Sequence, residues 1–284
     1  MQLLEDQIDT AVSRALDEDL SSGDITTEAL IDKTWPGKAY FLVKAPGVLA
    51  GIGIARRVFF KIDPEIQMEI LIADGSHIKR GDVAARVTGT FFNILMAERT
   101  AVNFLQHLSG VATETAKLVE TVKGLPVQIL DTRKTLPGLR VLEKYAVAMG
   151  GGHNHRMNLG DGILIKDNHL EMMQSHGFSI KEIITRVREK APFRFKIEIE
   201  VTTPEEAREA AEAGADIILL DNMEVPAMRK AVKFIKGRTL IEASGGITIA
   251  NARAIAETGV NFMSSGSVTH STKALDISLE FEKS

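Results

Sequence analysis

The sequence of 284 residues contains no cysteine, one tryptophan and two tyrosines. Without cysteine the chain has no disulfide bond, iron–sulfur cluster, thiolate metal site or thiol nucleophile. Proteins that bind single-stranded nucleic acid stack its bases on large aromatic side chains. The small number of such side chains in this chain therefore argues against that function. Positive charge is not in excess either, since 34 Lys and Arg stand against 38 Asp and Glu and the formal net charge is −4. We therefore expect neither nucleic acid nor a membrane as a partner.

The sequence also lacks long apolar runs and a recognisable targeting segment. The first residues, Met1-Gln-Leu-Leu-Glu-Asp, do not form a basic stretch followed by an apolar one. The longest apolar stretches, such as residues 47–55, are far below the roughly 18 residues of a membrane span. We therefore expect a cytoplasmic protein. A hydrophobic content of 44% and a charged content of 25% are typical of a globular chain, and the length suits two modest domains or one large α/β barrel.

The first half of the chain predicts a small mixed domain. Apolar residues at helical spacing between Leu4 and Ala15 predict one amphipathic helix. Residues 25–90 contain short apolar runs separated by tight turns, which predicts a mostly antiparallel β layer. Residues 94–122 have a helical pattern that links this layer to the second half. We place the domain boundary within this helical stretch, which gives predicted domains of residues 1–109 and 110–270, with the segment 271–284 packing back on the first.

The second half repeats a unit of about 22 residues, in which an apolar run ends in a polar residue and an amphipathic helix follows. The polar ends are Glu200, Asp221, Ser244 and Ser265. This alternation is typical of a parallel α/β barrel, where functional groups gather at the carboxyl ends of the strands. A doubly wound open sheet has the same pattern, and we favour the barrel.

One helix of the second half has complete end signals. Thr203 is suited to its N-cap, Pro204 to its first position, Glu206 to a capping box and Gly214 to its end. We therefore predict a helix from Pro204 to Ala213.

Positive charge is concentrated in residues 131–169, which carry six Lys and Arg against four Asp and Glu in an otherwise acidic chain. Arg133 and Lys134 follow one apolar run directly, and Lys166 follows another. At strand ends such cations converge, and they indicate an anionic ligand rather than solvated surface charges.

Carboxylates end two consecutive predicted strands, at Glu200 and Asp221, and Asp167 follows an earlier one. Carboxylate oxygens suit a hard divalent ion, and Mg²⁺ commonly binds one or two carboxylates together with substrate phosphates. The alternative is that both residues are salt-bridge partners of the nearby cations.

Two glycine- and serine-rich loops end the last units, Ser244-Gly245-Gly246 and Ser265-Gly266-Ser267. Glycine allows close approach of the backbone, and many barrels bind phosphate after their last two strands. Neither loop is a P-loop, so a nucleoside triphosphate is not indicated. Among the histidines, His155 is a plausible ligand contact and His169 a plausible brace of the strand exit. Cations, a divalent ion and phosphate loops together suit a sugar 1-diphosphate.

Several longer motifs of this chain resemble those of quinolinate phosphoribosyltransferases, the carboxylating nicotinate-nucleotide diphosphorylases of the type II phosphoribosyltransferase family. They are Asp131-Thr-Arg-Lys-Thr-Leu-Pro-Gly-Leu-Arg, Gly150-Gly-Gly-His-Asn-His-Arg, Leu164-Ile-Lys-Asp-Asn-His, Ile197-Glu-Ile-Glu-Val and Leu219-Leu-Asp-Asn-Met. The resemblance runs from Gly23 to Ser271. It implies an open seven-stranded α/β barrel with an N-terminal α/β sandwich domain, and at least a homodimer. It also implies Mg²⁺-dependent conversion of quinolinate and phosphoribosyl diphosphate to nicotinate mononucleotide, diphosphate and CO₂, a step of NAD biosynthesis.

The resemblance also implies roles for single residues. The residues for quinolinate are Arg133, His155, Arg156 and, from the neighbouring subunit, Arg99. Lys134 and Lys166 would lie where the two substrates meet, Glu200 and Asp221 would bind ribose hydroxyls and the metal, and these four would be catalytic. The remaining expected contacts are Thr132 and, for the 5′-phosphate, Ser244, Gly245, Gly246, Ser265, Gly266 and Ser267.

Three other functions remain open at this point. One is a molybdenum-transport-associated relative of the same fold, which tends to lack the complete segment Lys166-Asp-Asn-His. Another is a barrel aldolase in which Lys166 forms a Schiff base. The last is a non-catalytic protein that binds a phosphate ligand.

Overall fold

The computed structural model describes residues 5–235 and 237–282. These residues form two compact units. Unit 1 contains residues 5–116, 135–152 and 268–282, and unit 2 contains residues 117–134 and 153–267. Residues 135–152 and 268–282 thus belong to unit 1, although unit 2 begins at residue 117.

Unit 1 is built on an antiparallel sheet in the order β12-β1-β5-β3, accompanied by the pair β2-β4. Its helices and strands are α1 (Glu5–Asp19), α2 (Ile25–Leu30), β1 (Pro36–Val43), β2 (Gly47–Val48), α3 (Ile52–Ile62), β3 (Gln67–Ile70), β4 (His77–Ile78), β5 (Val83–Thr90), α4 (Phe91–Thr121, as far as Ala116), α5 (Arg140–Met149) and β12 (Ile277–Phe281).

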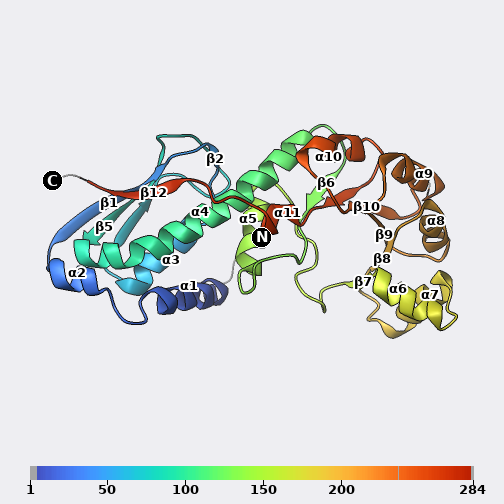
Figure 1. Cartoon of the computed structure of the whole chain (residues 1–284), viewed down its shortest axis with the longest axis horizontal. Helices are drawn as coiled ribbons and strands as arrows, with labels where there is room; N and C mark the ends of the chain where they lie inside the picture. Colours follow the sequence, from blue (N-terminus) through green and yellow to red (C-terminus); the bar gives the residue numbers. More distant parts are fainter. Residues whose placement is uncertain (1–4, 236, 283–284) are drawn as a thin grey trace. The chain divides into compact units, whose positions relative to one another are not determined.

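The first strand of this sheet, β1, lies between one strand that is near in sequence and one that is far away. It pairs with β5 on one side and with the C-terminal strand β12 on the other, where Ala39 faces Phe281 and Val43 faces Ile277 (Figure 1). Alternate residues of β1 are buried, including Phe41 and Val43, because successive side chains of a strand point to opposite faces.

The amphipathic helix predicted near the N-terminus is α1, whose buried residues are Val12 and Leu16. Leu4 lies outside the described residues. The antiparallel β layer and the long helix α4 are also confirmed. Helix α3 was not predicted, although its buried residues Ile52, Ala55 and Phe59 recur at helical spacing. Its apolar residues run on from the turn before it and obscure that period.

Unit 2 is a parallel sheet in the order β7-β8-β9-β10-β11-β6, with helices between the strands. Its elements are β6 (Gln128–Leu130), β7 (Ile163–Ile165), α6 (Asp167–Ser175), α7 (Ile180–Lys190), β8 (Ile197–Val201), α8 (Pro204–Glu212), β9 (Ile217–Asp221), α9 (Val225–Ile235), β10 (Leu240–Ser244), α10 (Ile249–Ala256) and β11 (Phe262–Ser264), and the short helix α11 (Ser267–His270) begins at its end. Figure 1 shows α8 and α9 on the outer side of the sheet.

The sheet of unit 2 is an open barrel, because side chains from all six of its strands or from the residues just after them line one pocket, described below. The α/β fold class is confirmed. The seventh strand is reduced in the described residues to a single parallel bridge between Leu130 and His153. Three glycines, Gly150 to Gly152, directly precede His153 and leave little regular strand there.

Within the described residues, no helix is both long and apolar enough to span a membrane.

The helix predicted from Pro204 is α8, and its capping box is confirmed. Thr203 Oγ1 accepts a hydrogen bond from Glu206 N at 3.2 Å, and Glu206 Oε2 accepts one from Thr203 N at 3.1 Å. We predict that Thr203→Ala lowers the free energy of unfolding by about 1 kcal/mol, because the backbone N–H of Glu206 in the first turn of the helix loses its hydrogen-bond partner. Denaturant unfolding measures this. The control Thr185→Ala removes an exposed hydroxyl inside α7, and an equal loss there would contradict the capping role.

Candidate functional site

One pocket lies at the carboxyl ends of the parallel strands of unit 2, with a volume of about 150 Å³. Its lining residues come from every strand of the sheet and from the segment after His153. They are Thr132, Arg133, Lys134, His155, Arg156, Leu164, Lys166, Glu200, Leu219, Asp221, Glu242, Ser244 and Ser264.

Nine predicted site residues thus line the same pocket: Thr132, Arg133, Lys134, His155, Arg156, Lys166, Glu200, Asp221 and Ser244. The other predicted residues of the phosphate loops, Gly245, Gly246, Ser265, Gly266 and Ser267, do not line it. Within these loops the Ser265 and Ser267 hydroxyl oxygens lie 2.8 Å apart. Arg99 is exposed on α4, in unit 1, and is not among the lining residues.

Arg133 and Arg156 both line the pocket, and the charge of one acts on the other. Burial, followed by the positive charge of Arg133, holds the pKa of Arg156 below its usual value, and the Glu198 carboxylate opposes this shift. Arg156 Nη1 donates a hydrogen bond to the carbonyl oxygen of Gly162 at 2.9 Å, which fixes one end of the guanidinium. Like charges held this close are favourable only when an anion lies between or beside them. The pair is therefore suited to a ligand with carboxylate groups.

Two carboxylates meet at the ends of β8 and β9. Burial, followed by the negative charge of Asp221, raises the pKa of Glu200, and Lys166 opposes the shift. Asp221 Oδ2 accepts a hydrogen bond from Asn222 Nδ2 at 2.8 Å, which orients that carboxylate. Two half-buried carboxylates that repel each other are hard oxygen donors, and they fit a divalent cation such as Mg²⁺.

The loop after β10 is fitted closely against the end of β9. Gly245 has φ +91°, and a Cβ on it would lie 2.2 Å from Asn222 Oδ1. Asn222 N also donates a hydrogen bond to Ser244 O at 2.9 Å. The glycine expected from the sequence is therefore needed by the turn itself, because a side chain would displace the residue that orients Asp221.

The segment that carries His155 and Arg156 is attached to β6 by Asp131, which is fully buried. Asp131 Oδ1 accepts a hydrogen bond from His155 N at 2.9 Å, and Oδ2 accepts one from Asn154 Nδ2 at 2.6 Å. Asp131 thus places the start of this segment beside the strand end.

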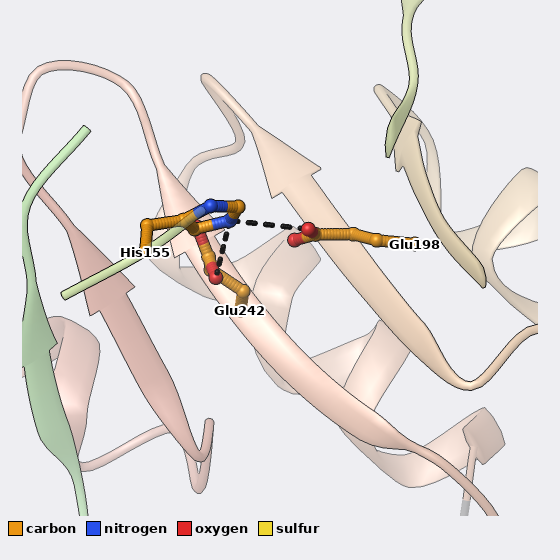
Figure 2. A group of neighbouring side chains, drawn as sticks. All are labelled: His155, Glu198 and Glu242. Carbon is orange, nitrogen blue, oxygen red and sulfur yellow. Dashed lines mark ion pairs between the residues drawn. The ribbon is translucent and has the colours of Figure 1, made fainter. Parts of the chain in front are cut away.

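Two buried residues of the site, Glu198 and Glu242, were missed by the sequence analysis. Both carboxylates point toward His155 beneath the pocket (Figure 2). They precede Glu200 and Ser244 by two residues on the same strands, and side chains two apart on a strand share a face. A charged residue inside an apolar strand, in phase with a site residue, was the signal that could have found them.

A larger cavity of about 530 Å³ lies on the other side of these glutamates, toward the amino ends of the strands. His155, Arg156 and Glu242 line both this cavity and the pocket. The interior of the barrel is thus divided by this layer of polar side chains.

His169, by contrast, braces the exit of β7, as expected from the sequence. Its Nδ1 accepts a hydrogen bond from Lys166 N at 3.0 Å, at the start of α6. This contact positions the backbone of Lys166.

Residues 24–109 match the family profile described as "Quinolinate phosphoribosyl transferase, N-terminal domain", and residues 111–280 match "Quinolinate phosphoribosyl transferase, C-terminal domain". The chain is 40% identical to "Quinolinate phosphoribosyltransferase [decarboxylating] 2, mitochondrial" of Nicotiana glauca, over 94% of this chain and 80% of that relative. It is 41% identical to "Probable nicotinate-nucleotide pyrophosphorylase [carboxylating]" of Bacillus subtilis, over 93% of this chain and 89% of that relative.

Solved structures are similar over the whole chain. NadC from Streptococcus pyogenes superposes with a TM-score of 0.94 at 41% identity, covering 100% of both chains. The nicotinate-nucleotide pyrophosphorylase from Francisella tularensis has a TM-score of 0.92 at 36% identity, covering 99% of this chain and 98% of that chain.

The anchoring role of Asp131 can be tested by its amide isostere. We predict that Asp131→Asn lowers the free energy of unfolding by about 1–3 kcal/mol. The new side-chain amide N–H group at position 131 would face the N–H donor of His155 or of Asn154 in a buried place, and one of these two hydrogen bonds would be lost. Urea unfolding followed by circular dichroism measures the change. Asp17→Asn, exposed on α1, is the matched control. A loss no larger than that of the control would show that the segment does not depend on Asp131.

Proposed function

The chain belongs to the quinolinate phosphoribosyl transferase family, and from this we propose that it transfers the phosphoribosyl group of phosphoribosyl diphosphate to quinolinate, with loss of CO₂. The products are nicotinate mononucleotide and diphosphate, so the reaction serves NAD biosynthesis. This is the activity named for the relatives that match almost the whole chain.

The observation that carries the proposal is the joint placement of a cation pair and a carboxylate pair in one pocket. Arg133 and Arg156 suit the two carboxylates of quinolinate, because guanidinium groups bind carboxylates through two parallel hydrogen bonds. Glu200 and Asp221 suit the hydroxyls of a ribose and a divalent ion. Lys134 and Lys166 line the same pocket, where they would lie at the junction of the two substrates. This combination favours the transferase over an aldolase, which needs one lysine but no paired carboxylates.

The reaction follows from these placements. The pyridine nitrogen attacks the anomeric carbon of the ribose as the bond to diphosphate breaks, and positive charge develops on the sugar. The negative charges of Glu200 and Asp221 stabilise this charge. When the bond between C2 and its carboxylate then breaks, CO₂ leaves and the electron pair stays on C2, where the positive charge of the neighbouring pyridinium nitrogen stabilises it until C2 takes up a proton.

We propose Mg²⁺ as the metal, with Glu200 and Asp221 as its protein ligands, because their oxygens and mutual repulsion fit a hard cation. When bound, the ion would neutralise charge on the departing diphosphate. The loops at Ser244 and Ser265 would bind the 5′-phosphate through backbone N–H groups and hydroxyls.

We also propose a homodimer in which Arg99 completes the quinolinate pocket of the neighbouring subunit. Its exposure on α4, outside the residues that line the pocket, is consistent with such a role. Analytical ultracentrifugation tests the dimer, and a sedimentation coefficient of a monomer at micromolar concentration would contradict it.

The decisive assay incubates the protein with quinolinate, phosphoribosyl diphosphate and Mg²⁺ and measures CO₂ and nicotinate mononucleotide. Both should form in equal amounts. Folded protein that forms neither would overturn the proposed function. Covalent trapping of Lys166 by an aldehyde and borohydride would favour the aldolase instead.

Substitution of Arg156 tests how quinolinate is bound. We predict that Arg156→Lys raises the KM for quinolinate by about tenfold or more, because Lys lacks the two-pronged donor geometry of Arg. The KM for phosphoribosyl diphosphate should change much less. Arg238→Lys, exposed on the outside of unit 2, is the control in the same steady-state assay. An unchanged KM for quinolinate would exclude Arg156 from its binding.

Substitution of Glu200 tests the carboxylate pair. We predict that Glu200→Gln lowers kcat by about 10²–10³-fold, because the amide keeps the shape but loses the charge that stabilises the sugar cation. The exposed Glu209→Gln on α8 should leave kcat unchanged. A kcat of Glu200→Gln within twofold of the control would assign the electrostatic role to other residues.

A further inference from the structure

Beneath the pocket, the His155 ring lies between two buried glutamates (Figure 2). His155 Nε2 is 3.1 Å from Glu198 Oε2 and 3.7 Å from Glu242 Oε2. The glutamate side chains are 6% and 2% exposed. Neither glutamate has a role in the reaction proposed above.

The hydrogen bonds of the ring determine where its hydrogen lies. His155 Nδ1 accepts a hydrogen bond from the backbone N–H of Arg156 at 2.7 Å. An acceptor nitrogen needs its lone pair, so Nδ1 carries no hydrogen. A neutral ring then has its single hydrogen on Nε2, which faces the two carboxyl groups. A doubly protonated ring would set Nδ1–H against the N–H of Arg156.

The position of the hydrogen on the His155 ring decides between two functions of this cluster. One histidine and two carboxylates are also a set of ligands suited to a metal ion. A ring nitrogen binds a metal through its lone pair. In His155 the lone pair of Nδ1 is already used by Arg156 N–H, and Nε2 holds the hydrogen. The cluster is therefore suited to support the ring rather than to bind a cation.

The burial of these glutamates is itself unfavourable. Glu198 Oε1 and Glu242 Oε1 are buried without a hydrogen-bond partner within the described residues. Burial, followed by the nearby Glu198 carboxylate, raises the pKa of Glu242 to about 7. Apolar side chains of similar size would fill the space at a lower free-energy cost. A specific role of the carboxyl groups accounts for their presence.

We propose that Glu198 and Glu242 are positioning residues, which accept the Nε2–H of His155 and so orient the ring with Nδ1 toward the backbone N–H of Arg156, which that nitrogen fixes. Positive charge for a dicarboxylate then comes from the arginines, while His155 presents a fixed, uncharged surface. The proposal deepens the proposed function, and only its kinetic tests rest on that function.

The state of the ring is read directly by ¹⁵N NMR of the full chain with labelled histidine at neutral pH. His155→Gln identifies the signals of His155 by their loss. We expect a neutral ring protonated at Nε2 and, in Glu198→Gln, an Nε2–H proton at lower frequency, because an amide oxygen is a weaker acceptor than a carboxylate. A doubly protonated ring, or a hydrogen on Nδ1, in the unsubstituted protein would overturn the proposal. This measurement decides the matter even if a variant fails to fold.

Kinetics separate positioning from general support of the structure. We expect Glu198→Gln and Glu242→Gln each to raise the KM for quinolinate by about tenfold and to leave the KM for phosphoribosyl diphosphate within about twofold. The exposed Glu257→Gln, whose residue pairs with Arg253 on the surface, is the matched control and should change neither. A KM for quinolinate equal to that of the control in both variants, or an equal rise of both KM values, would overturn the positioning role.

A conservative pair of variants tests the Nε2–H contact by rescue. The amide nitrogen of His155→Gln reaches the place of Nε2, whereas that of His155→Asn lies near the place of Nδ1. We expect His155→Gln to keep a KM for quinolinate closer to that of the unsubstituted protein. An equal or better KM in His155→Asn would overturn the proposal. If the protein forms no product at all, the proposed function fails, and the NMR result still stands by itself.

Discussion

Every second residue of a parallel strand faces the inside of the barrel, and this alternation decides which side chains of unit 2 meet. On β8 it brings Glu198 and Glu200 to one face, and on β10 it brings Glu242 and Ser244 together. Residues at the strand ends therefore line the pocket, and some of the residues two positions earlier, Leu164, Leu219 and Glu242, line its deeper part. Any side chain placed at these inner positions acts on the pocket above it, because only one strand repeat separates the two.

A buried carboxylate beneath the pocket partly offsets the charge of two pocket arginines. Arg133 and Arg156 raise the positive potential of the pocket, and Glu198 beneath them offsets part of it, as the opposing effects on the pKa of Arg156 show. A buried cation pair without this anion would be less stable when no ligand is bound. A layer of glutamates thus allows a pocket that is positive enough for an anionic ligand and still compatible with folding.

Much of this site was predictable from sequence, because strand ends in an α/β repeat are recognisable from the polar residue that follows an apolar run. Six site residues found in this way line one pocket, Arg133, Lys134, Lys166, Glu200, Asp221 and Ser244, whereas Thr132, His155 and Arg156 were expected from the family resemblance. Glu198 and Glu242 were missed because a charge inside an apolar run was treated as part of the strand. Helix α3 was missed because the apolar residues of the turn before it continue into the helix and obscure the helical spacing of its buried residues. Hydrogen-bond geometry, such as the one that sets the tautomer of His155, depends on distances that no spacing along the chain reveals.

The pairing of β12 with β1 has a consequence for the order of folding. Residues 277–281 form an edge strand of the sheet of unit 1, although about 230 residues separate them from β1. During synthesis the residues of unit 2 leave the ribosome before this strand does, so the parallel barrel has all its residues in solution while the N-terminal sheet still lacks one edge. Until the last residues emerge, the free hydrogen-bonding groups of β1 stay available to other strands. Loss of a few C-terminal residues would thus expose a sheet edge in the N-terminal unit and promote aggregation there.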